Sequence, residues 1–126
     1  VYTVVPVSAA PASCEGAPFT VTITINPEPV VLSNTAVTRC SDLAVNVTLS
    51  SSVASVAAAT YNIATNANGL TQSGGTVSAG PAKAANELVD DVWRNTGLVP
   101  VDVVYTITPV SLAGCAGDPF LVTVTV

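Results

Sequence analysis

The most regular pattern in the chain is Val104-Tyr-Thr-Ile-Thr-Pro-Val-Ser111 followed by Cys115-Ala-Gly-Asp-Pro-Phe-Leu-Val-Thr-Val-Thr-Val126. In both runs large apolar residues alternate with Thr and other smaller residues, and a period of two is typical of a β-strand that buries one face. The runs are separated by a short turn and therefore predict an antiparallel β-hairpin. The side chains expected to point into a core are Val101, Val103, Tyr105, Ile107, Phe120, Val122, Val124 and Val126.

The same pattern occurs at the start of the chain, as Val1-Tyr-Thr-Val-Val-Pro-Val-Ser8 and Cys14-Glu-Gly-Ala-Pro-Phe-Thr-Val-Thr-Ile-Thr-Ile25. Six of eight and seven of twelve positions are identical to the later runs, including Tyr, Pro, Cys, Gly and Phe. A shared preference for Val and Thr does not explain these matches. The repeat distance of about 100 residues corresponds to one small domain and indicates a tandem repeat.

The repeat divides the chain into two unequal parts. We expect residues 1–26 to be the C-terminal hairpin, the last two strands, of a preceding module, and residues 27–126 to be one complete module. The linker between them is Asn26-Pro27-Glu28-Pro29. Its two prolines stiffen the backbone and lack the amide protons that a strand needs, so they separate the two parts.

Within residues 27–126, further short strands are predicted between turns rich in Asn, Gly and Ser. Leu43, Val45, Val47 and Leu49 alternate with smaller residues and are expected to point inward. Other candidate strands are 30–32, 60–65, 76–78 and 91–95. About seven short strands in a module of this size predict an all-β, Ig-like Greek-key β-sandwich.

One stretch has a different pattern. Between Pro81 and Trp93 the apolar residues have helical spacing, and Lys83 and Glu87 form a possible i,i+4 ion pair. We expect at most a short helix here, giving way to a strand near Asp91.

Composition excludes several classes of function. Charged residues make up 9% of the chain and hydrophobic residues 49%, yet no apolar run approaches the roughly 20 residues of a membrane-spanning helix. The lack of His excludes His-based triads, bases and metal ligands. Three cations against eight acids argue against binding of nucleic acid or anionic lipid. We therefore expect a protein without catalytic activity, cofactor, nucleic-acid partner or membrane insertion.

The repeated hairpin motif, together with Asn26-Pro27-Glu28-Pro29-Val30, resembles the PKD-like repeats of giant cell-surface adhesins of gliding, type IX-secreting bacteria. Residues 38–41 and 92–96 also fall where such repeats carry a Cys-Ser turn and an Asn-Thr strand end, while residues 61–63 depart from the Tyr-x-Trp pair that is frequent in them. The resemblance implies an extracellular, non-catalytic module in a long filament or stalk used for surface adhesion and gliding motility. Its partners would be neighbouring repeats and, through other parts of the protein, surface polysaccharide.

The three cysteines are consistent with an oxidising, extracellular setting. In a seven-strand Greek-key module, Cys40 would lie in the first turn and Cys115 in the last, at opposite ends separated by roughly 30 Å. A disulfide requires Cα atoms about 4.4 to 6.8 Å apart. We therefore hypothesise bonds between modules, with Cys40 facing forward along the array and Cys14 and Cys115 facing backward. Two alternatives remain. In one, Cys40 and Cys115 of the same module form a bond and Cys14 is left unpaired; in the other, all three cysteines are free thiols.

Other candidate sites have simpler explanations. Glu87, Asp90 and Asp91 could bind calcium, with Glu28 or Asp118 of a neighbouring module as further ligands. Their spacing matches no calcium loop, and acids on a solvated turn are commoner, so we expect no metal.

A second function remains open, that of an accessory glycan-binding or spacer module of a secreted hydrolase. It predicts an exposed aromatic platform, to which Trp93 would be the obvious contributor. A position for Trp93 in the core or at its rim is the simpler expectation.

Overall fold

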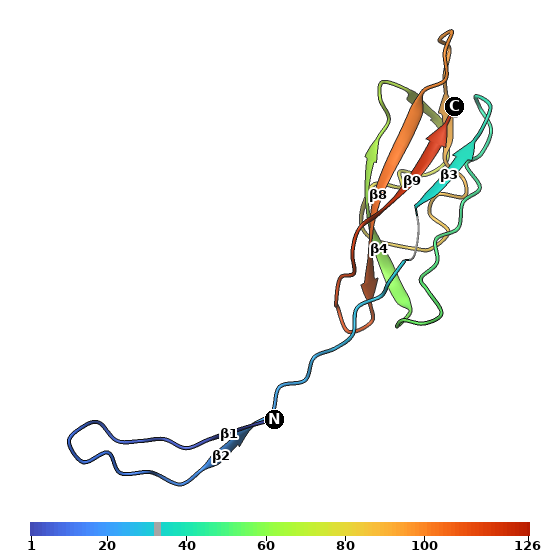
Figure 1. Cartoon of the computed structure of the whole chain (residues 1–126). Helices are drawn as coiled ribbons and strands as arrows, with labels where there is room; N and C mark the ends of the chain where they lie inside the picture. The colour runs from blue at the N-terminus through green and yellow to red at the C-terminus, as the bar shows by residue number, and fades with distance from the viewer. Residues whose placement is uncertain (32–33) are drawn as a thin grey trace.

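The computed structural model describes residues 1–31 and 34–126, and within them every regular element is a β-strand (Figure 1). Two strands form an N-terminal hairpin, β1 (Tyr2–Val4) and β2 (Phe19–Val21). Seven belong to the module that follows: β3 (Thr35–Thr38), β4 (Ala58–Asn66), β5 (Thr71–Gly74), β6 (Gly80–Lys83), β7 (Val92–Arg94), β8 (Asp102–Ser111) and β9 (Phe120–Thr125). The prediction of an all-β module with about seven strands is confirmed.

The larger sheet of the module has the strand order β3-β9-β8-β4-β6. The edge strand β3 runs parallel to β9, whereas the other neighbours are antiparallel. The alternation seen in the sequence decides which face of this sheet is covered, since Val103, Tyr105 and Ile107 are fully buried while Asp102, Thr106 and their neighbours on the other face are not.

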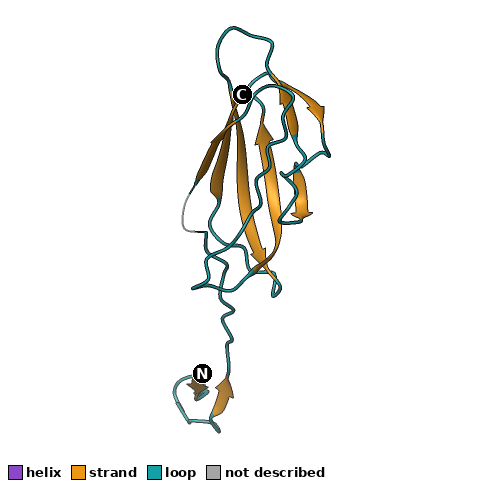
Figure 2. Cartoon of the chain, turned by 90° about the vertical axis from the view of Figure 1, so that its right-hand side faces the viewer, coloured by secondary structure: helices purple, strands orange, loops and turns teal. Residues whose placement is uncertain are grey.

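The second layer is less regular. Strands β5 and β7 pair with each other, and residues 43–49 run beside β7 without forming a continuous strand. Their backbone hydrogen bonds do not form a regular ladder: the Val45 N–H donates to the Asp91 carbonyl at 2.8 Å, the Asn46 N–H to the Val89 carbonyl at 3.1 Å and the Leu49 N–H to the Ala85 carbonyl at 2.7 Å. Figure 2 shows the long strands extending along the length of the module. The core lies between this layer and the larger sheet, and the second layer contributes Val45, Val47, Leu49, Leu88 and Trp93 to it.

Residues 81–93, where at most a short helix was expected, form no helix. Strand β6 occupies Gly80–Lys83, where Ala82 has a φ of 55°, and turns rather than a helix follow it. The expected ion pair is nevertheless present, because Lys83 Nζ lies 2.8 Å from Glu87 Oε1 across these turns. Turns can therefore place residues four apart together without a helix.

Three strand predictions also differ from the structure. The candidate strand 76–78 lies in a loop, and the strand of that region is β5. For the candidate 30–32, Val30 and Val31 are outside any strand and Leu32 lies outside the described residues. In the predicted strand 43–49 Leu43 is exposed, because positive φ values at Asp42 and Asn46, of 63° and 52°, turn the backbone away from a regular strand. The predictions for 60–65 and 91–95 agree with β4 and β7.

Candidate functional site

The two repeated segments are copies in structure as well as in sequence. Tyr2 pairs with Val21 and Val4 with Phe19, in the same register that joins their counterparts in β8 and β9. The turns match as well. The Ser8 N–H donates to the Cys14 carbonyl at 2.9 Å, and the Ser111 N–H donates to the Cys115 carbonyl at 2.9 Å. The repeated sequence therefore encodes a repeated hairpin with the same backbone hydrogen bonds.

The two copies differ in what covers them. Five apolar side chains on one face of the N-terminal hairpin are each at least 37% exposed: Tyr2, Val4, Phe19, Val21 and Ile23. Their counterparts in the module are each at most 7% exposed: Tyr105, Ile107, Phe120, Val122 and Val124. Figure 1 shows the hairpin at the far end of the linker, away from the module. The N-terminal hairpin thus leaves exposed the face that its counterpart in the module buries.

The linker is fixed to one end of the module, here called the rear end, at the turn between β8 and β9. Pro29 is fully buried there, and a Cβ atom on Gly117 would lie only 1.9 Å from the Pro29 carbonyl oxygen. The Cys115 thiol donates a hydrogen bond to the Asn26 carbonyl oxygen at 3.7 Å. The linker residues Asn26, Pro27, Glu28 and Pro29 therefore lead directly onto the turn that carries Cys115.

The opposite end, here called the front end, lies where β3 and β9 finish. The Arg39 N–H donates to the Thr125 carbonyl at 2.9 Å, which continues the pairing of the two strands. The Arg39 guanidinium donates to the Ala44 and Val45 carbonyls at 3.2 and 3.0 Å and so closes the turn that contains Cys40. Asn95 Nδ2 donates to the Val126 carbonyl at 2.8 Å and holds the end of β9. Hydrogen bonds thus hold the backbone around Cys40 and Val126 in place at the front end.

The structure places Cys40 and Cys115 at opposite ends of the module. The register links Cys40 to the end of β9 beside Asp102, while Cys115 lies beside Ser111, at the far end of β8. Nine residues of strand separate Asp102 from Ser111, or roughly 30 Å at 3.3 Å per residue. All three cysteines are thiols in this chain, with Cys14 and Cys40 exposed and Cys115 partly exposed. A bond between Cys40 and Cys115 of the same module is incompatible with this separation.

The proposed calcium candidates have separate partners. Glu87 forms an ion pair with Lys83, and the exposed Asp90 accepts a hydrogen bond from the Thr76 hydroxyl. Asp91 is buried in the core. Among the described residues, no group of three or more acidic or Cys side chains gathers at a place where it could hold a metal ion. These carboxylates therefore carry local structural contacts.

A buried polar chain at the centre of the module was not predicted. The Trp93 Nε1–H donates to the Tyr105 hydroxyl at 2.6 Å, and this hydroxyl donates to Asp91 Oδ2 at 2.7 Å. Gln72 Nε2 donates to Asp91 Oδ1 at 3.2 Å. Burial raises the pKa of the Asp91 carboxyl, and hydrogen bonds from Ser78 and Tyr105 partly oppose that rise. A sequence signal existed, since Asp91 precedes Trp93 by two residues and so shares its inward face.

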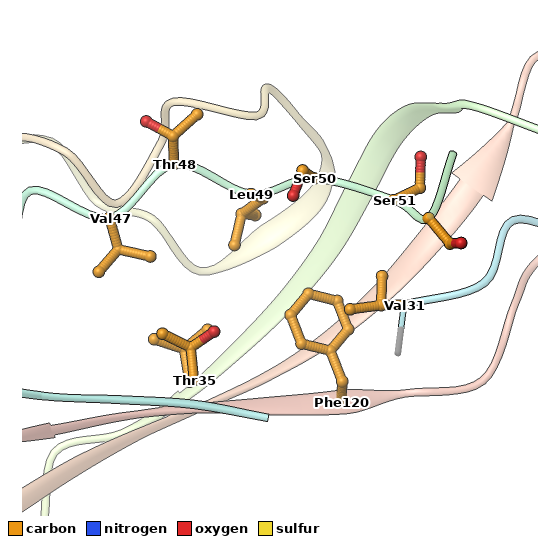
Figure 3. Close-up of a pocket in the computed structure, with 10 residues that line it drawn as sticks. Val31, Thr35, Val47, Thr48, Leu49, Ser50, Ser51 and Phe120 are labelled. Atoms are coloured by element: carbon orange, nitrogen blue, oxygen red, sulfur yellow. The ribbon is translucent and has the colours of Figure 1, made fainter. Parts of the chain in front are cut away.

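Hollows on the described part of the chain include two whose linings carry no acid, base or thiol. The one in Figure 3 has a volume of about 220 Å³ and opens between Val31, Thr35 and Phe120 on one side and residues 47–52 on the other. None of the side chains that line it titrates, so the serines there have no base to activate them. The second, of about 340 Å³, lies at the rear end and is lined by Asn26, Pro27, Val56, Ala57, Ser111, Leu112 and Ala113.

The family assignment follows from comparison with known families. The PKD-like domain family matches residues 1–29 and 37–126. The chain belongs to this family. Domains of the PKD-like family are typically non-catalytic modules and are commonly extracellular. Comparison with curated proteins and with solved structures gave no match. Within the described part of the chain, no helix is long and apolar enough to cross a membrane.

Proposed function

We propose that this PKD-like chain is a structural segment of a tandem array, in which residues 1–26 complete a preceding module and residues 27–126 form the next one. The array would form a long filament or stalk of a large cell-surface adhesin that serves adhesion and gliding motility. The observation that carries the proposal is the N-terminal hairpin. It reproduces the register of β8 and β9 and exposes the face that these strands bury.

The exposed face has a large unfavourable hydration cost. Full burial of one Val, Ile or Phe side chain stabilises a protein by about 1.5 to 3 kcal/mol, and the hairpin presents five large apolar side chains. An isolated two-stranded hairpin is at best marginally stable in water. In the module, residues 43–49 and β7 form the layer that covers the inward face of β8 and β9. An equivalent layer in a preceding module would cover the exposed face of the hairpin.

The proposed role as a structural part of a cell-surface adhesin rests on the chemistry of the module and on its resemblance to adhesin repeats. The chain lacks His, none of the side chains lining the hollow in Figure 3 titrates, and Glu87 and Asp91 have structural partners. Repeats that contact only their neighbours add length and stability together, as linear arrays require.

The alternative of a glycan-binding module gains no support from the aromatic residues. Tyr61, Trp93, Tyr105 and Phe120 are each at most 7% exposed. The exposed pair, Tyr2 and Phe19, occupies positions whose counterparts are core residues. Within residues 34–126, therefore, the module has no exposed aromatic platform on which a sugar ring could stack.

A tandem protein tests the proposal. Residues 27–103 are placed before Val1, so that Val1 follows Val103 as Val104 does in the chain. We expect amide exchange of β1 and β2 to slow to the level of β8 and β9, and small-angle scattering to give an elongated particle about two modules long. A matched tandem with Tyr2→Ser and Phe19→Ser should lose the exchange protection of the hairpin. Equally fast hairpin exchange in both proteins would refute the assignment of residues 1–26.

A further inference from the structure

The geometry of the two module ends points to a covalent joint: we propose that Cys40 of one module forms a disulfide with Cys115 of the next. This inference rests on the proposed function, because it requires consecutive modules. It concerns a bond that holds neighbours together, and its partner is a second copy of the same module.

The first argument comes from the parallel pairing of β3 and β9. Thr38 is in register with Thr125, and the Arg39 N–H donates to the Thr125 carbonyl. Continuing this register places Arg39 beside Val126 and Cys40 beside the residue that follows Val126. The repeat aligns Val126 with Ile25, so that following residue corresponds to Asn26.

The second argument comes from the linker. Asn26 is the residue whose carbonyl oxygen accepts the hydrogen bond from the Cys115 thiol, at 3.7 Å. A Cys40 at the front end of a preceding module would thus lie one strand spacing, about 4.8 Å, from the residue that Cys115 already touches. The extended register and the Cys115 contact thus point to the same linker residue from consecutive modules. A disulfide would require the two Cα atoms to lie about 4.4 to 6.8 Å apart across this joint.

Both cysteines are held in place for such a bond. Arg39 closes the Cys40 turn through the Ala44 and Val45 carbonyls. The Cys115 N–H donates to Ser111 Oγ at 3.1 Å, and Gly114 provides the positive φ of 81° that this turn requires. Cys14 has the same bond to Ser8 Oγ at 2.9 Å, so the backward-facing cysteine is a repeated feature of the hairpin.

The chemistry requires an external oxidant of the disulfide class. The two thiols lose two protons and two electrons and form one S–S bond. One disulfide of the oxidant, either a small molecule or a protein dithiol oxidase, takes up both electrons and protons and becomes two thiols. A secreted protein passes through compartments that supply such oxidants.

The test uses the tandem of residues 27–103 followed by the full chain, refolded with glutathione disulfide and mapped by mass spectrometry without reduction. We expect one disulfide per chain, joining the Cys40 of the added copy to Cys115. Cys40→Ser in the added copy or C115S should remove this bond. Cys14→Ser, and Cys40→Ser in the original module, should leave it intact, because neither has a partner in this tandem.

Two results would overturn the inference: free thiols at both positions after oxidation, or a peptide that joins Cys40 to Cys115 of the original module. Two measurements on the fully reduced tandem, amide exchange of the hairpin and small-angle scattering, distinguish a failure of the disulfide proposal from a failure of the array proposal. If the reduced tandem is elongated with a protected hairpin but no bond forms, the array stands and the disulfide does not. If the reduced hairpin remains unprotected, the array itself fails.

Discussion

At the scale of single residues, Tyr2 and Tyr105 are the most informative pair. They occupy equivalent positions in equivalent registers. Tyr105 is fully buried, accepts a hydrogen bond from Trp93 and donates one to Asp91, while Tyr2 is 62% exposed. Burial and the Asp91 carboxylate raise the pKa of the Tyr105 hydroxyl, so it remains a donor at any ordinary pH.

Tyr105→Phe should therefore destabilise the chain. It leaves the Trp93 indole N–H without an acceptor in the core and removes a hydrogen bond from the buried Asp91 carboxyl. We expect the free energy of unfolding to fall by about 2 to 3 kcal/mol, measured by urea denaturation. Tyr2→Phe is the matched control and should change it by less than about 0.5 kcal/mol. Equal effects of the two substitutions would show that the polar chain does not contribute as described.

At the scale of elements, the sequence predicted the strands in which alternation is strict and failed where backbone geometry dominates. The inward faces of β8 and β9 follow directly from alternating Val, Tyr, Ile and Phe. The same alternation in residues 43–49 places Val45, Val47 and Leu49 in the core, yet positive φ values break the strand. In residues 81–93 apolar residues at helical spacing lie in turns and strands, because pairing with β4 and contact with the core outweigh a weak local preference.

At the ends of the module, too, only part of the structure could be predicted from the sequence. Their cysteines and prolines are visible in the sequence, and topology predicted that Cys40 and Cys115 lie at opposite ends. The contact between Cys115 and Asn26, and the close approach of the Pro29 carbonyl to Gly117, depend on how the linker folds against the turn. No periodicity in the sequence encodes such a contact between distant segments.

The turn between β8 and β9 gives a prediction at this scale. Gly117→Ala would place a Cβ atom 1.9 Å from the Pro29 carbonyl oxygen, so the linker must move away. We expect a loss of about 1 to 3 kcal/mol in the free energy of unfolding and faster backbone motion at residues 26–30 in NMR relaxation. Gly16→Ala is the control at the equivalent position, where the closest atom is the exposed Pro6 side chain at 3.0 Å. A rigid linker in the Gly117→Ala protein would contradict this account.

At the scale of the whole molecule, two highly exposed leucines, Leu98 and Leu112, lie at opposite ends of the module. Leu98 is fully exposed in the loop that Asn95 ties to Val126 at the front end. Leu112 is 93% exposed at the rear end, beside the 340 Å³ hollow that the linker helps to line. In the proposed array these two ends would face each other, and each leucine would offer the other apolar area that water otherwise covers.

We therefore expect both leucines to stiffen the joint between modules. In the tandem protein, Leu98→Ser in the added copy or Leu112→Ser in the original module should broaden the distribution of inter-module orientations, measured by residual dipolar couplings and small-angle scattering. In the single chain each should change the free energy of unfolding by less than about 0.5 kcal/mol, since neither side chain is buried there. Val77→Ser, at a side chain 70% exposed in the loop between β5 and β6, is the control and should leave the joint unchanged. If Leu98→Ser and Val77→Ser give the same scattering curves, the two leucines do not meet at the joint, and this account of its stiffness is wrong.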